Sequence, residues 1–221
     1  MSAERIPVIG IIGGIGSGKS TLADALGRHF RCGRLDADTA GHRALLRSDV
    51  AAALKSVFGD EIFDSQGKVI RSRLAERVFG ADEKHQAARK KLESIVHPHI
   101  RKDIVEQLEQ HQSRKDCDMI LLDAALLIEA GWSNDCDALI FVDAPVELRR
   151  QRVGERGWSA DDLARREASQ LGIEEKRRRA DLIVDQSQKV ETVAAFAADW
   201  IRKRFHLNPG TDLFSPVTSR S

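Results

Sequence analysis

Apolar and polar residues follow two different patterns along this chain. Short, largely apolar runs are candidates for buried strands, and the longer stretches between them carry apolar residues three or four positions apart, as amphipathic helices do. We predict five strands from these runs, at residues 6–12, 32–35, 119–122, 138–142 and 182–184. Because strands that alternate with helices usually pair in parallel, the pattern predicts an α/β fold with helices on both faces of a parallel sheet.

Two stretches interrupt this alternation, and the first is residues 41–112. They contain no run that resembles a central strand, whereas apolar residues at helical spacing, such as Ile100 and Ile104, recur along them. We therefore expect a helical insertion. Pro98 suits the first turn of a helix, where its missing N–H costs nothing, so His97-Pro98 is predicted to separate two helices.

The second interruption, residues 146–179, is rich in arginine. It contains Arg149, Arg150, Arg152, Arg156, Arg165 and Arg166. A run of this kind is usually a solvated face, but phosphate transfer needs mobile cations that close over the site and exclude water, so the pattern leaves both interpretations open. Ser159 and Asp162 have the spacing of a capping pair and predict a helix that runs toward Gln170.

The end of the chain combines one more helix with a stretch that lacks periodicity. A single apolar stripe predicts the helix, and it consists of Val190, Val193, Ala194, Ala197 and Ile201. Residues 206–221 are rich in Pro, Ser and Thr without a helical or strand pattern, which predicts a flexible tail.

The composition, 42% hydrophobic and 31% charged, is that of an ordinary globular chain. Its 35 basic and 34 acidic residues leave a net charge of +1, so no overall field favours a nucleic acid or an anionic membrane as a partner. The sequence shows no apolar run of membrane-spanning length and no cleavable signal pattern. We expect a cytoplasmic protein that is a monomer or a weak oligomer.

The cysteines and histidines give no familiar metal or disulfide pattern. Cys32, Cys117 and Cys136 are odd in number and lack C-x-x-C spacing, which argues against a disulfide framework or a zinc site and predicts buried, reduced thiols. His97 and His99 flank a proline without an accompanying cysteine or acid triad, so we expect them to serve packing, capping or substrate contact rather than zinc binding.

Residues 13–20 read G-G-I-G-S-G-K-S, directly after the first apolar run and before a good helix opening at 21–26. Glycines let successive backbone N–H groups turn inward and form an anion nest at a helix N-terminus. Lys19 then supplies a charge to the β- and γ-phosphates, and Ser20 a hydroxyl ligand for Mg²⁺. A glycine loop alone is often only a tight turn, but the complete motif between a strand and a helix predicts binding of a nucleoside triphosphate.

Acidic residues follow two of the predicted strands. Asp36 and Asp38 come after the second strand and Asp123 after the third, and ligands of open parallel sheets bind at the carboxyl ends of the strands. One acid of the first pair is a candidate base for an attacking hydroxyl, although the two share one side only if the strand continues through them, and Asp38 also suits a helix N-cap. Asp123 stands where an acid would hold Mg²⁺, usually through water.

Together these motifs resemble the dephospho-CoA kinase family. The matching pieces span about residues 6–203 in the family order and are 13–21, Asp36-Ala37-Asp38, Arg71 ahead of Leu74 and Val78-Phe79, His97-Pro98, Leu126-Leu127-Ile128-Glu129, Gln170, Glu175-Lys176 and Ala180-Asp181. The phosphate loop is shared with many folds, whereas the whole series is specific.

The resemblance implies ATP-dependent phosphorylation of the ribose 3′-hydroxyl of dephospho-CoA, with Mg²⁺ as cofactor. It also implies a P-loop NTPase three-layer fold with a five-stranded parallel sheet, a helical acceptor-binding insertion and a helical lid. The corresponding divisions are a nucleotide-binding core (1–40, 113–145 and 180–205), the insertion (41–112), the lid (146–179) and the tail (206–221).

The resemblance implies residue roles as well. Asp38 would be the general base and act with Lys19, while Ser20 and Asp123 would hold the metal. The ATP-binding residues would be Gly14, Ile15, Gly16, Ser17, Gly18, Lys19, Ser20, Thr21, Arg152 and Arg156. The acceptor pocket would contain Asp36, Arg71, His97 and Leu126.

Three positions depart from the family pattern. Ala125 stands where the family usually has proline, Arg149 where it has glutamine, and Gln186 where it has asparagine. The first relaxes a turn, because alanine frees φ and restores an N–H. The other two bear on the lid and on recognition of the adenine.

Two other functions share the phosphate loop. A GTPase switch also begins with this motif, and residues 64–67 match D-x-x-G, but they do not follow a buried strand and the chain has no Asn-Lys-x-Asp for guanine. A kinase of nucleosides or nucleoside monophosphates is the closer alternative. His97-Pro98 and Asp36-Ala37-Asp38 favour dephospho-CoA as the acceptor.

Overall fold

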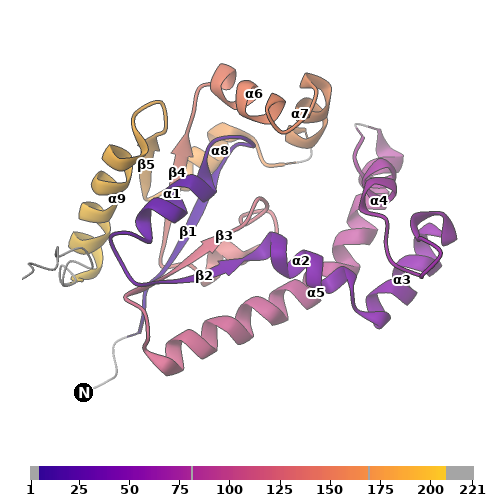
Figure 1. Cartoon of the computed structure of the whole chain (residues 1–221), viewed down its shortest axis with the longest axis horizontal. Helices are drawn as coiled ribbons and strands as arrows, with labels where there is room; N and C mark the ends of the chain where they lie inside the picture. The colour runs from indigo at the N-terminus through magenta and orange to yellow at the C-terminus, as the bar shows by residue number, and fades with distance from the viewer. Residues whose placement is uncertain (1–4, 81, 169, 208–221) are drawn as a thin grey trace, which may run out of the picture.

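The computed structural model describes residues 5–80, 82–168 and 170–207, and a single five-stranded sheet lies at its centre (Figure 1). The strands are β1 (Val8–Gly13), β2 (Cys32–Asp36), β3 (Met119–Asp123), β4 (Ala138–Asp143) and β5 (Leu182–Asp185). All neighbouring strands are parallel, in the order β2-β3-β1-β4-β5. The predicted α/β class and each predicted strand are confirmed, with boundaries shifted by at most two residues.

Helices cover both faces of the sheet and make three layers. Helices α1 (Lys19–Leu26) and α9 (Val190–Phe205) pack on one face, and α2 (Ala37–Leu45), α5 (Glu83–Arg114) and α8 (Ile173–Arg178) on the other. Successive residues of β1 divide between the two cores, because strand side chains alternate: Val8 and Ile12 join one core, Ile9 and Ile11 the other. The predicted apolar stripe of α9 is buried as expected, apart from the half-buried Val190.

The stretch after β2 is helical, as its pattern predicts. Helices α3 (Ser48–Phe58) and α4 (Arg71–Val78) and the short 3₁₀ turn η1 (Asp60–Ile62) gather with α2 around α5 at one end of the molecule (Figure 1). The D-x-x-G match at 64–67 lies in the turn between Phe63 and Val69, which form an isolated antiparallel bridge. It therefore does not follow a buried strand.

The expected break at His97-Pro98 is wrong, because Pro98 lies inside the single helix α5. Proline removes the hydrogen bond to the carbonyl of Ser94 and displaces that carbonyl, which bends a helix without having to end it. Val96 and Ile100, on either side of the proline, are buried in the same core, so packing holds both halves helical. In Figure 1 the two halves of α5 run in different directions.

The arginine-rich stretch folds into α6 (Val146–Gly154), α7 (Ala160–Glu167) and α8, above the carboxyl ends of the strands (Figure 1). Ser159 and Asp162 form the predicted capping box at the start of α7. The helix ends at Glu167, three residues before Gln170. A second 3₁₀ turn, η2 (Trp132–Asp135), precedes β4.

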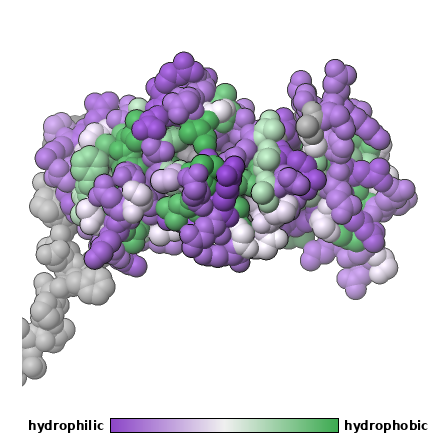
Figure 2. Space-filling view, turned by 90° about the horizontal axis from the view of Figure 1, so that it is seen from above, coloured by the Kyte–Doolittle hydropathy of each residue, from purple (hydrophilic) through white to green (hydrophobic). Residues whose placement is uncertain are grey.

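Two of the divisions implied by the resemblance fall inside helices, the first at 40/41 in α2 and the second at 112/113 in α5. Most of the expected tail, residues 208–221, lies outside the described residues. Within the described ranges, the helices are all too short or too polar to cross a bilayer. Figure 2, seen from the side of α6 and α7, shows a largely hydrophilic surface with hydrophobic residues confined to patches.

Candidate active site

The phosphate loop connects the carboxyl end of β1, a central strand, to the start of α1. Gly16 has φ of 76° and Gly18 has φ of 96°, a region that side chains other than glycine rarely tolerate. A Cβ atom on Gly16 would also lie 2.7 Å from the backbone oxygen of Arg149. Glycine is therefore required at both positions by the backbone and, at Gly16, by the close approach of α6.

Several polar groups at this loop lack a protein partner. Helix α1 has neither a side-chain N-cap nor an acidic residue in its first turn, so its N-terminal amides stay available to an anion. The buried Ser17 Oγ, Arg149 Nε and Gln186 Oε1 are also without hydrogen-bond partners among the described residues. Arg149 and Gln186 pack against Gly14 and Gly18 of the loop. Unpaired buried polar atoms gathered at one helix start are typical of a binding site for a polar anion.

Lys19 bends back over its own loop. Its Nζ donates to the carbonyl oxygens of Gly13 at 3.4 Å and Gly14 at 3.2 Å. Burial lowers the pKa of Lys19, and the charges of Lys176 and Arg156 lower it further, while Asp123 and Asp38 oppose this shift. A bound polyphosphate would favour the charged form, so the ammonium group suits an anionic ligand.

Ser20 and Asp123 form a pair of oxygen ligands. The Ser20 hydroxyl donates to Asp123 Oδ2 at 3.0 Å, across the gap between the start of α1 and the end of β3. Mg²⁺ prefers oxygen ligands and usually keeps several waters beside one or two protein groups. The donor set present here therefore fits Mg²⁺.

Asp36 and Asp38 differ in role, because β2 ends at Asp36 and α2 begins at Ala37. Asp36 is the N-cap of α2: its Oδ1 accepts from the backbone amides of Asp38 at 2.9 Å and Thr39 at 3.0 Å, and its Oδ2 accepts from the Thr39 hydroxyl at 2.7 Å. The expectation that Asp38 caps the helix is wrong, since Asp36 already holds the free amides. The two acids do not share a strand face either, because the strand stops between them.

Asp38 is thereby free to act on a ligand. None of the described hydrogen bonds engages its carboxylate, and Asp36 and Asp123, cross-strand partners at the ends of β2 and β3, lie close enough to affect it. Loss of water in the crevice raises the pKa of Asp38, the charges of Asp36 and Asp123 raise it further, and Lys19 and His42 oppose the shift. A carboxylate with a raised pKa is a better proton acceptor than an ordinary aspartate.

The arginines of α6 approach the loop from the other side. Arg152 Nη1 donates to the carbonyl oxygens of Gly16 at 3.3 Å and Ser17 at 2.9 Å. Arg156, at the end of the same segment, is exposed and close enough to affect the pKa of Lys19. Arg149 is buried, pairs with Glu167 of α7 and packs against Gly14.

Sequence reasoning assigned no role to the ion pair of Lys176, which is only 2% exposed. Its Nζ lies 3.1 Å from Glu129 Oε1 and donates to Gln170 Oε1 at 3.0 Å, and Glu129 also accepts from the backbone amide of Leu171 at 2.8 Å. These contacts join α8 and the segment before it to the loop after β3. Lys176 lies in the charged run 174–179, which has the pattern of an exposed helix, so periodicity gives no sign of its burial. The signal that could have found the network is the set of family motif pieces, which contains Glu129, Gln170 and Lys176.

The residues expected in an acceptor pocket are spread over several elements. Arg71 is the exposed first residue of α4, and Leu126 is half-buried in the loop after β3. His97 packs against Trp132, with ring centroids 5.6 Å apart and ring planes tilted by 58°, and helps to line an open cavity of about 440 Å³ between α5 and η2. Burial lowers the pKa of His97, so its ring is neutral at pH 7. The described contacts do not bring Arg71 or His97 onto the phosphate loop.

The three departures from the family pattern take different positions. Ala125 is half-buried in the loop after β3, whereas Arg149 and Gln186 are buried beside the phosphate loop. Two of the three positions, Arg149 and Gln186, therefore lie against the phosphate loop.

A parallel α/β sheet with a G-x-x-x-x-G-K-S loop at the end of a central strand, flanked by carboxylates and arginines, defines a P-loop protein equipped for phosphate transfer. A sequence model of the dephospho-CoA kinase family matches residues 7–192. The chain belongs to the dephospho-CoA kinase family.

Individual relatives agree with this membership. The chain is 37% identical over 202 residues to the dephospho-CoA kinase of Corynebacterium diphtheriae, a match that covers 88% of this chain and 96% of the relative. It is 36% identical over 178 residues to that of Rhodopirellula baltica, covering 79% and 80%.

Solved structures show the same fold. The crystal structure of TT1252 from Thermus thermophilus matches with a TM-score of 0.74 and 34% identity, over 90% of this chain and 98% of the other. Dephospho-CoA kinase from Campylobacter jejuni matches with a TM-score of 0.62 and 26% identity, over 89% and 98%.

Proposed function

We propose that this chain transfers the γ-phosphoryl group of ATP to the ribose 3′-hydroxyl of dephospho-CoA, giving coenzyme A and ADP. The observation that carries the proposal is the convergence of Lys19, Ser20, Asp123 and Asp38 at the carboxyl ends of β1, β2 and β3. Membership of the dephospho-CoA kinase family supports this acceptor over a nucleoside.

In this reaction Asp38 accepts the proton of the attacking hydroxyl. The hydroxyl oxygen forms the new bond to the γ-phosphorus, the bond to the β–γ bridging oxygen breaks, and ADP leaves with that electron pair. A positioned base contributes about 10²–10⁴ in rate to such a step. Asp38 suits the role because Asp36 takes over the capping of α2 and because burial, together with the neighbouring acids, raises the pKa of Asp38.

The phosphate loop holds the donor. The backbone amides of residues 14–21 would surround the β- and γ-phosphates, and Lys19 would exchange the carbonyls of Gly13 and Gly14 for phosphate oxygens. Arg152 already contacts the loop, and Arg156 lies near Lys19, so both would reach the phosphates when the lid segment 146–179 closes.

Ser20 and Asp123 would hold Mg²⁺, the serine directly and the aspartate directly or through water. When bound, the cation offsets the negative charge that develops on the phosphate oxygens. Their positions support this role, since Ser20 is the second residue of α1 and Asp123 the last of β3.

The insertion 41–112 would bind the acceptor, with Asp36, Arg71, His97 and Leu126 contributing. Its support is the open cavity beside His97, which lies next to the segment that follows β3, and the neutral His97 ring, which can both donate and accept a hydrogen bond. The core and tail boundaries, the cytoplasmic location and the monomeric or weakly oligomeric state stay predictions.

A coupled assay of ADP release tests the acceptor directly. Purified chain with ATP and Mg²⁺ is given dephospho-CoA, a nucleoside or a nucleoside monophosphate in parallel. We expect rapid ADP release with dephospho-CoA alone, and mass spectrometry of the product should show one added phosphoryl group. A product from a nucleoside without one from dephospho-CoA would favour the nucleoside kinase alternative.

A further inference from the structure

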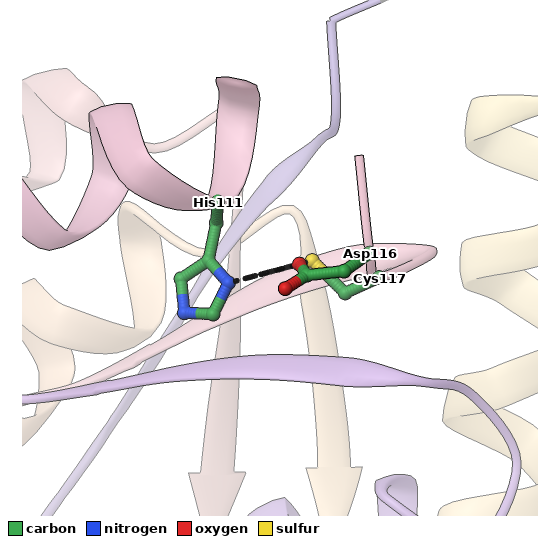
Figure 3. A group of neighbouring side chains, drawn as sticks. All are labelled: His111, Asp116 and Cys117. Carbon is green, nitrogen blue, oxygen red and sulfur yellow. Dashed lines mark hydrogen bonds and ion pairs between the residues drawn. The ribbon is translucent and has the colours of Figure 1, made fainter. Parts of the chain in front are cut away.

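A second group of chemically reactive side chains lies at the opposite end of the sheet from the phosphate loop. His111 is near the end of α5, and Asp116 and Cys117 are in the turn that leads into β3. Figure 3 shows the three side chains pointing toward one another. His111 Nδ1 lies 3.3 Å from Asp116 Oδ1 and 4.0 Å from Cys117 Sγ, and one ligand atom from each residue lies within 4.8 Å of the others.

We propose that His111, Asp116 and Cys117 bind one divalent transition metal of the zinc type, with water as a fourth ligand. A tetrahedron built from the usual zinc bond lengths has N···O edges of about 3.3 Å and S···N edges of about 3.6 Å. The observed N···O distance already matches the first value, and the observed S···N distance of 4.0 Å exceeds the second by a few tenths of an ångström, which a small side-chain movement would close. One nitrogen, one oxygen and one sulfur suit Zn²⁺ better than Mg²⁺ or Ca²⁺.

The backbone of β2 fixes two of the three ligands. A Cβ atom on Gly33 would lie 3.1 Å from three atoms of the His111 ring, so the ring rests directly on the strand. The backbone of Gly33 also lies close enough to the Cys117 sulfur to affect its pKa, and Cys117 is only 8% exposed. A bulkier residue at position 33 would displace the imidazole from its neighbours.

The neighbouring acid, Asp118, is not one of the proposed metal ligands. Asp118 is engaged by Arg31, whose Nη2 lies 2.6 Å from its Oδ1 and whose backbone amide donates to its Oδ2 at 2.9 Å. Asp116 keeps its carboxylate beside His111 instead. With a thiolate, a carboxylate and a neutral imidazole, the three ligands carry two negative charges, which balance a divalent cation.

The sulfur ligates a cation as a thiolate, so metal binding would release the Cys117 proton as the sulfur–metal bond forms. The metal would tie the end of α5 to the start of β3 and stabilise the folded chain by mass action. The site is remote from the phosphate loop, so this inference does not rest on the proposed kinase reaction.

Cobalt substitution tests the site. The full chain, reduced and freed of metal by a chelator, is titrated with Co²⁺ in excess Mg²⁺, which keeps the oxygen ligands at Ser20 and Asp123 occupied. We expect one Co²⁺ per chain with a thiolate-to-cobalt charge-transfer band that Zn²⁺ displaces, and a rise in Tm on addition of Zn²⁺. Absence of the band from the wild-type chain would overturn the proposal.

Variants assign the ligands. Cys117→Ser should abolish the band, and Cys136→Ser, which changes another thiol, should leave it intact. A band that survives Cys117→Ser, or that is lost in Cys32→Ser while Cys117 is present, contradicts the assignment. If Cys117→Ser does not fold, Asp116→Asn on the exposed turn decides instead: it should weaken Co²⁺ binding by at least about tenfold, and unchanged affinity would refute the site.

Discussion

The two sides of the phosphate loop carry opposite charges and are built in different ways. On the side of β2 and β3, the carboxylates of Asp36, Asp38 and Asp123 are placed by strand register and by the cap of α2. On the side of α6 to α8, the cations Arg149 and Lys176 are buried in ion pairs with Glu167 and Glu129. Lys19 lies between them and is affected by charges from both sides.

This difference in charge means that the two sides of the site suit different chemical groups. In the proposed reaction the cationic side would face the polyphosphate of the donor, and the acidic side would face the attacking hydroxyl and the cation. The acids need no partner to stay in place, because backbone geometry positions them. The buried cations need their acids, since an unpaired charge in the interior is costly.

The largest effect on the acidic side is expected from removing the carboxylate of Asp38. Asp38→Asn should lower kcat by about 10²–10⁴, because it removes proton acceptance, while the KM for ATP changes little, because the phosphate loop is intact. Steady-state kinetics with dephospho-CoA measure both constants. Asp24→Asn, an exposed aspartate of α1, is the control, and full turnover in Asp38→Asn would refute the role of the base.

Removing the charge between the two sides is the next largest change. Lys19→Ala should lower kcat by about 10²–10³ and also weaken ATP binding, because the ammonium group interacts with the phosphates in both the ground state and the transition state. Titration of nucleotide by calorimetry, beside kinetics, separates the two effects. Lys55→Ala, an exposed lysine of α3, should behave like wild type. Wild-type affinity in Lys19→Ala would contradict the assignment of the phosphate loop.

On the cationic side, breaking one pair should cost stability. Lys176→Met leaves Glu129 unpaired, and the free energy of unfolding should fall by about 3 kcal/mol, the low end of the range for buried pairs because the Glu129 side chain is 21% exposed. Urea denaturation measures the change. Lys203→Met breaks a surface pair with Asp199 and should change stability by less than about 1 kcal/mol. Equal losses in both variants would show that Lys176 is no more important than a surface charge.

The smallest expected effect is a shift in the pH profile. The pKa of Asp38 is raised above its ordinary 3.8, and only the ionised form accepts a proton, so kcat should fall as the pH drops through that raised value. Asp36→Asn keeps a good N-cap but removes one of the charges that raise this pKa. The acid limb of kcat should then move to lower pH, by less than about one unit. If the acid limb of the kcat profile does not move, the pKa of Asp38 does not determine it.

The sequence predicted well wherever short segments determine the structure. The three central strands β1, β3 and β4 are continuous apolar runs because a parallel sheet covered on both faces needs them, whereas the edge strands β2 and β5 alternate buried and exposed residues. The capping box of α7 is complete within four residues. The phosphate loop is equally local, since its glycines are required by backbone angles within the loop itself. Pro98 was misjudged because packing on both sides of it outweighed one lost hydrogen bond.

What the sequence by itself determined is therefore the sheet, the loop and the family. Only the tertiary structure decided that Asp36 rather than Asp38 caps α2, that Lys176 is buried in a charged run, and that His111 meets Cys117. The physical reason is that charge and burial at these positions depend on contacts between segments that are distant along the chain. Local sequence patterns indicate backbone preference and the period of apolar burial. They do not indicate which polar side chains contact one another in the folded chain.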